Sequence, residues 1–226
     1  MALVQIPHKF IDKLTPAEEI SQINFLVIGT FNPGIPSLDI ASLAVNLQEK
    51  ILKNQSGLNF YDRPNNRFWG VIDRIFFNNE YSGVSNDFKR LEGLKYYKGF
   101  NDPISVNKTQ SEFCIKNGIF ITDIVSKIAV DTDDLNKIYD GYSDSFFDNS
   151  VCEWNTNNII SLINQYNPKR VLFTFSKSKA IPEISKNVDC ILAGNETRAF
   201  FLSSPSGNAK NSYLKLIDDW SVHFNS

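Results

Sequence analysis

Four short apolar runs along the chain predict buried β-strands. They lie at 24–28 (NFLVI), 119–122 (IFIT), 170–175 (RVLFTF) and 199–203 (AFFLS). Each run is nearly continuous rather than alternating, which is typical of strands covered on both faces.

Segments with helical periodicity separate these strands. Apolar residues recur at i, i+3, i+4 and i+7 from Phe68 to Ile75, and a second stripe covers 159–166 before Asn167-Pro168 ends it. Leu214 and Ile217, with Trp220, begin a third stripe. Strands alternating with helices predict right-handed crossovers, and therefore an α/β fold: a three-layer α/β/α domain with a four-stranded, mainly parallel central sheet.

Length and composition fit one domain spanning residues 1–226. The chain is 42% hydrophobic and 21% charged, without a repeat or a Pro/Gly-rich linker to divide it. Its apolar runs are far shorter than a bilayer span, and no basic leader opens the sequence, so we expect no membrane partner and no secretory signal. Three scattered cysteines argue against disulfides and against a four-thiolate cluster. A cytoplasmic location is therefore expected.

Charge and histidine content narrow the chemistry. A net charge of −2 and a pI near 5.7 are atypical of a nucleic-acid binder, so any such contact needs a local basic patch. Residues 61–100 carry an excess of Lys and Arg that fits either such a patch or an ordinary solvated face. Only His8 and His223 are present, so a histidine-rich metal site is not expected.

Unusual residues follow the first and last predicted strands, where ligands of parallel sheets bind. Gly29-Thr30-Phe31-Asn32-Pro33-Gly34 predicts a tight turn carrying one amide side chain, and it lacks the dinucleotide and P-loop signatures. The loop at 203–210 (SSPSGNAK) is rich in small residues. Its backbone N–H groups and Lys210 suit a phosphate, although a structural turn with an N-cap serine has the same pattern.

Four segments together resemble the uracil-DNA glycosylase superfamily. They are FLVIGTFNPG (25–34), FYDRPNNRFWGVI (60–72), GIFITDIV (118–125) and LSSPSGNAKNS (202–212), in the order and placement of that superfamily. The first two are similar to motifs of the mismatch-specific uracil/thymine branch. The last two are more similar to the hypoxanthine-DNA glycosylase branch, in which an Asp ends the second strand.

The resemblance implies roles for individual residues. Asn32 and Asn66 match the catalytic, water-positioning amides of the two branches. Tyr61 matches the aromatic residue on which the extruded base stacks, and Asp123 the position that reads the base. The implied base-binding residues are Thr30, Phe31, Tyr61 and Asp123, and the implied DNA-binding residues are Arg63, Arg67, Ser204, Ser206, Gly207, Asn208 and Lys210.

The chemistry of these residues fits base excision. An amide can hold a water beneath the sugar carbon while backbone N–H groups stabilise the departing base, so no histidine, metal or organic cofactor is expected. Because an ionised Asp123 only accepts hydrogen bonds, it suits the N1–H of hypoxanthine and cannot donate to a neighbouring carbonyl. We therefore expect a monomeric, monofunctional DNA glycosylase that flips a deaminated base out of DNA, hypoxanthine first and uracil or thymine mispairs second.

Several alternatives remain open at the level of sequence. The chain could be a catalytically inactive nucleic-acid- or nucleotide-binding module of the same fold, or a hydrolase of free nucleosides. At the residue level, Asn66 could cap a helix beginning near Arg67, Tyr61 could belong to the core, and Asp123 could cap a helix starting at Ile124. Phe68 and Trp69 are expected in the core because of their helical spacing with Ile72.

Overall fold

A four-stranded parallel sheet forms the centre of the molecule, with strand order β3-β2-β6-β7. The computed structural model describes residues 3–55, 57–61, 66–77, 103–141, 144–176, 181–206 and 211–224. All four strands coincide with the predicted apolar runs, and the predicted runs at 170–175 and 199–203 each extend two residues beyond the strand. The strands are β2 (Phe25–Gly29), β3 (Ile119–Asp123), β6 (Arg170–Phe173) and β7 (Ala199–Phe201).

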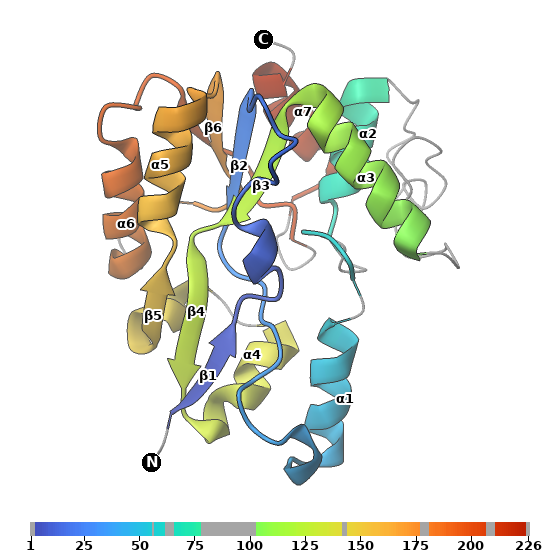
Figure 1. Cartoon of the computed structure of the whole chain (residues 1–226), viewed down its shortest axis with the longest axis vertical. Helices are drawn as coiled ribbons and strands as arrows, with labels where there is room; N and C mark the ends of the chain where they lie inside the picture. Colours follow the sequence, from blue (N-terminus) through green and yellow to red (C-terminus); the bar gives the residue numbers. More distant parts are fainter. Residues whose placement is uncertain are drawn as a thin grey trace.

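Helices cover both faces of this sheet, as the predicted three-layer α/β/α fold requires. Alternate residues of β2 point to opposite sides: Leu26 and Ile28 belong to one apolar cluster, Phe25 and Val27 to another. Helices α5 and α6 pack in the first cluster, and α2 and α7 in the second, with α3 on the same side (Figure 1). The helices are α1 (Val45–Asn54), α2 (Phe68–Phe77), α3 (Pro103–Asn117), α4 (Leu135–Gly141), α5 (Thr156–Tyr166), α6 (Pro182–Leu192) and α7 (Tyr213–Phe224).

The three helices expected from apolar stripes are α2, α5 and α7. Phe68 and Trp69 are 1% and 2% exposed, which confirms their expected place in the core. Helix α5 ends as predicted at Asn167, which adopts a left-handed conformation with φ 45° just before Pro168. Within the described residues, no helix has the length and apolar character to cross a membrane.

A second, antiparallel sheet that the sequence did not predict extends from the central one. Only Ile124 separates the end of β3 from the start of β4, so the chain continues from one sheet into the next (Figure 1). Asp123 therefore does not cap a helix starting at Ile124, and that alternative was wrong. The second sheet has the order β1-β4-β5 and consists of β1 (Val4–Pro7), β4 (Val125–Val130) and β5 (Val151–Trp154).

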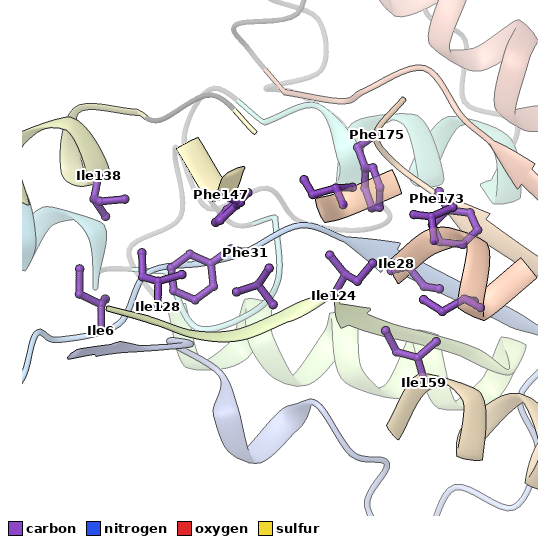
Figure 2. Packing of buried hydrophobic residues seen from close by; sticks show 14 of the residues in the cluster. Ile6, Ile28, Phe31, Ile124, Ile128, Ile138, Phe147, Ile159, Phe173 and Phe175 are labelled. Carbon is purple, nitrogen blue, oxygen red and sulfur yellow. The ribbon is translucent and has the colours of Figure 1, made fainter. Parts of the chain in front are cut away.

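One apolar cluster joins the two sheets. Ile6 of β1 and Ile128 of β4 belong to the same cluster as Ile28 and Phe173 of the central sheet. Figure 2 shows these side chains in a continuous row, with Ile124 in its middle. The junction between the sheets is therefore packed, and side chains on either side of it are held in fixed relative positions.

Candidate functional site

The carboxyl ends of three central strands meet where the order of the sheet reverses. Strand β2 lies between β3 and β6. The chain passes from β2 to β3 on one side of it and later returns to β6 on the other side. The Ile124 amide donates to the Gly29 carbonyl at 3.0 Å, and the Thr174 amide to the Ile28 carbonyl at 3.0 Å. The turn after β2 thus leaves the sheet at the topological switch point, where α/β folds bind their ligands.

Asp123, the last residue of β3, is the centre of a buried hydrogen-bond relay. It is 1% exposed, and its Oδ2 accepts from Asn32 Nδ2 at 2.7 Å and from His8 Nε2 at 2.8 Å. The Phe10 amide donates to His8 Nδ1 at 2.9 Å. Because Nδ1 is an acceptor, the imidazole is neutral with its proton on Nε2, which donates to the carboxylate.

His8 reaches the site because the N-terminal strand pairs beside it. Its amide donates to the Ser126 carbonyl at 2.8 Å, and the Lys9 amide donates to the Asn32 carbonyl at 2.7 Å. The imidazole is 1% exposed and lies 5.5–6.0 Å, between ring centroids, from three phenylalanines. Sequence reasoning expected no histidine in the site, and the structure corrects this. The residue has no local motif, and its partner is 115 residues away.

The hydrogen bond to Asp123 fixes the orientation of the Asn32 carboxamide. A carboxylate only accepts hydrogen bonds, so Asn32 must present its nitrogen to Asp123 and turn its oxygen away. No described residue donates to Asn32 Oδ1 or to Asp123 Oδ1. Asn32 is half-buried, so its Oδ1 is an acceptor that a water can reach, whereas Oδ1 of Asp123 is a buried acceptor.

Gly29 allows the Asp123 and Tyr61 side chains to approach each other. A Cβ atom at residue 29 would lie 2.2 Å from Asp123 Oδ1 and 2.8 Å from the Tyr61 hydroxyl, so only glycine leaves room for both. The Tyr61 hydroxyl hydrogen-bonds Thr174 Oγ1 at 2.9 Å, from the end of β6. Polar atoms of Asp123, Tyr61 and Thr174 therefore gather beside Gly29.

Tyr61 is partly buried, and one face of its ring packs against the core, as the alternative of a core role predicts. It stacks on Phe68 with a centroid distance of 4.2 Å and an interplanar angle of 11°. Its backbone has φ 63°, in the left-handed region that a bulky side chain rarely adopts. Such a conformation persists only where surrounding contacts impose it, and here the stacking and the hydroxyl contact do so.

A second carboxyl group, that of Asp144, lies beside the relay. Asp144 begins the short 3₁₀ segment Asp144–Asn149. Burial raises the pKa of the Asp144 carboxyl above its ordinary value; a hydrogen bond from the Thr30 side chain lowers it, and the charge of Asp123 raises it. Thr30 thus contacts Asp144, and the two carboxyl groups are close enough to influence each other.

Asn66 has a structural contact that accounts for its amide oxygen. Its Oδ1 accepts from the Phe68 amide at 2.9 Å, at the first turn of α2. This is the capping interaction that the sequence left as an alternative to a catalytic role.

Arg67 organises the loop that follows β7. Its amide donates to the Pro205 carbonyl at 2.9 Å, and its guanidinium donates to the carbonyls of Ser206, at 2.6 Å, and Asn211. Ser204 Oγ accepts from the Ser206 amide at 3.3 Å in the same loop. The guanidinium is thus engaged with protein carbonyls, which hold Ser204 and Ser206 near the start of α2.

The remaining predicted residues divide into two groups. The Phe31 ring is 4% exposed and packs in the core beside Ile128 and Phe147, so only its backbone lies near the strand ends (Figure 2). The predicted DNA-contacting residues Arg63, Gly207, Asn208 and Lys210 lie outside the described part of the chain.

The described residues include no group of three or more His, Cys, Asp and Glu side chains that could hold a metal ion. Compared with models of known protein families and with curated proteins, the chain matches none.

Proposed function

We propose that this protein is a monofunctional DNA glycosylase that hydrolyses the N-glycosidic bond of a deaminated base. One observation supports this most: Asn32 is held by Asp123 with its amide oxygen turned away from the carboxylate, at the switch point of a parallel sheet. An amide oxygen in this position can accept a hydrogen bond from a water. The order of the four sequence motifs supports the same proposal.

The reaction requires little acid or base strength from the protein. The bond between the sugar C1′ and the base nitrogen breaks, and its electron pair leaves with the base. The water held by Asn32 Oδ1 adds to C1′, and the proton that it loses neutralises the departing base. Asn32 contributes by fixing the water before the bond breaks, which is the kind of preorganisation that lowers a barrier.

Asp123 and Tyr61 would bind the flipped base. Asp123 Oδ1 is an acceptor with no donor among the described residues, so it suits the N1–H of hypoxanthine or the N3–H of uracil. Tyr61 supplies an aromatic side chain next to it, and its hydroxyl is fixed by Thr174. A carboxylate cannot donate to a base carbonyl, and uracil has carbonyls on both sides of N3–H whereas hypoxanthine has one beside N1–H. Hypoxanthine is therefore the favoured substrate, and uracil or thymine mispairs follow.

A second candidate, hydrolysis of free nucleosides, is favoured by the Asp144 carboxyl. The Asp144 carboxyl contacts Thr30 in the turn after β2, and the charge of Asp123 raises its pKa, so two acidic groups influence each other there. The negative potential of these two carboxyl groups repels a phosphate backbone but does not repel an uncharged nucleoside.

One assay separates these functions. Oligonucleotides carrying a single hypoxanthine, uracil, xanthine or thymine-mismatch site are incubated with the protein and then treated with alkali, which converts abasic sites into strand breaks. We expect breaks at hypoxanthine above all. Cleavage of free nucleosides alone would favour the second candidate. Binding of the oligonucleotides without cleavage would make the protein a nucleic-acid-binding module.

The two asparagines give a matched pair of variants. Asn32→Ala removes the oriented amide, so the single-turnover rate should fall by ~10²-fold or more. Asn66→Ala removes a helix cap, so it should cost about 1 kcal/mol of unfolding free energy and leave the single-turnover rate near that of the wild type. Equal rates for wild type and both variants would remove these residues from the mechanism.

A further inference from the structure

We infer that His8 is a positioning residue for the reaction: it fixes the Asp123 carboxylate and, through it, the Asn32 amide. This inference rests on the proposed function. His8 donates to the same carboxylate oxygen that accepts from Asn32, at 2.8 Å and 2.7 Å respectively. The residue lies outside all four motifs that resemble the glycosylases.

Both imidazole nitrogens of His8 have defined partners. The Phe10 amide occupies Nδ1 and Asp123 occupies Nε2, so the ring cannot flip without losing two hydrogen bonds. The ring lies against Phe10, Phe31 and Phe60, which exclude water from it. With both nitrogens of the buried ring paired, His8 is held rigidly, because any other orientation of the ring leaves a buried donor or acceptor unpaired.

Loss of the His8 donor should therefore affect Asn32. With one donor left, the Asp123 carboxylate is free to rotate about its χ2 angle, and the Asn32 nitrogen follows the oxygen that it contacts. Asn32 Oδ1 then no longer has one fixed position. A water misplaced by about 1 Å can cost a reaction as much as a hundredfold in rate.

Two substitutions of His8 separate its two hydrogen bonds. In His8→Gln, the amide nitrogen is as many bonds from Cα as Nε2 is, so it can still donate to Asp123. In His8→Asn, the amide oxygen matches Nδ1 and can accept from Phe10, but no donor reaches Asp123. Both variants remove the ring from the same aromatic surroundings, so a purely structural role predicts similar losses of stability and activity.

Single-turnover rates on the oligonucleotide that the wild type cleaves best test the inference. We expect His8→Asn to lower the rate by about tenfold to a hundredfold with unchanged affinity for the oligonucleotide, and His8→Gln to restore most of the rate. The same reduction in both variants would overturn the positioning role. His223→Gln, which removes the other histidine, should leave the rate unchanged.

NMR provides a readout that does not depend on activity. In the wild type, the ¹⁵N shifts of His8 should show a proton on Nε2 and none on Nδ1. The side-chain NH₂ signals of Asn32 should move in His8→Asn and stay in place in His8→Gln. A His8 proton on Nδ1, or Asn32 signals that are the same in all three proteins, would overturn the inference. Absence of cleavage by the wild type would instead remove the proposed function, and the NMR result would still decide whether His8 orients Asn32.

Discussion

The two oxygens of the Asp123 carboxylate have different surroundings, and this difference divides their roles. Oδ2 is buried under two donors, His8 and Asn32. Oδ1 lies over Gly29 beside the Tyr61 hydroxyl. One side chain thus connects the amide proposed to hold the water with the acceptor proposed to read the base.

Asp123→Asn should change the choice of base. Because both donors point at the Oδ2 position, the amide oxygen must take that position and the amide nitrogen the Oδ1 position. Both bases lose the N–H contact to Oδ1, and the new N–H donates to a base carbonyl instead. Uracil has a carbonyl on both sides of N3–H, whereas hypoxanthine has one on only one side of N1–H, so uracil gains more. A hydrogen bond at a buried site is worth ~1–3 kcal/mol, so the ratio of uracil to hypoxanthine cleavage rates should rise roughly tenfold to a hundredfold.

Rates on the two lesions in otherwise identical oligonucleotides give this ratio. An unchanged ratio, with both rates intact, would mean that Asp123 does not face the base. Asn66→Asp is a useful control. It replaces an amide with a carboxylate, the reverse of Asp123→Asn, at a residue whose side-chain oxygen caps α2.

At the level of elements, the 3₁₀ segment Asp144–Asn149 brings a half-buried acid to the turn after β2. Burial raises the pKa of the Asp144 carboxyl, so the folded state holds its proton more tightly than the unfolded chain does. Stability is therefore lost as the pH rises through the ordinary aspartate pKa of about 3.9 towards the raised value. At neutral pH the ionised side chain destabilises the fold.

Asp144→Asn should accordingly raise the melting temperature at pH 7, and this gain should shrink as the pH approaches 3. The asparagine oxygen still accepts a hydrogen bond from Thr30, so the contact itself is conserved. Thermal unfolding of both proteins across this pH range measures the effect. A stability difference that is the same at every pH would show that ionisation of Asp144 is not its cause.

The elements that could be predicted from the sequence are those with a strong local pattern. Continuous apolar runs identified the four central strands, because strands covered on both faces have no polar side to interrupt them. Strands β1 (VQIP) and β5 (VCEW) are only four residues long, so each alternates between its two faces just twice, which is too short a pattern to identify a strand. Strand β4 follows β3 without a turn residue between them, so the sequence gives no boundary there.

The candidate site was predictable to a similar extent. Asn32 and Asp123 follow predicted strands, so their approach follows from a parallel sheet. His8 could not be found in this way, because it depends on the pairing of β1 with β4. Phe31 was predicted to bind the base because it belongs to the first motif. Its ring packs instead in a core to which the second, unpredicted sheet contributes.

At the scale of the whole molecule, the shared core makes the second sheet part of the folding unit. Ile6 on β1 is fully buried in the cluster that also contains the central strands. Ile6→Ala should cost about 2–5 kcal/mol of unfolding free energy, the usual range for a large-to-small change in a core. Unfolding should remain one transition, because β1 cannot lose its packing independently of the rest.

Chemical denaturation followed by both circular dichroism and tryptophan fluorescence tests this prediction. Leu3→Ala is the matched control: Leu3 precedes β1 and is 46% exposed, so its loss should stay within about 0.5 kcal/mol. Two separated transitions in Ile6→Ala would show that the second sheet unfolds alone.

The pairing of β1 with β4 also determines when the site can form during synthesis. His8 leaves the ribosome 115 residues before Asp123. At ~5–20 residues per second this is a delay of roughly 6–23 seconds, in which β1 has no strand to pair with. Its backbone donors and acceptors, and the apolar side chain of Ile6, stay exposed to other nascent chains for that time. The proposed catalytic relay therefore cannot assemble until more than half of the chain has been synthesised, and His8 is the first of its residues to be made.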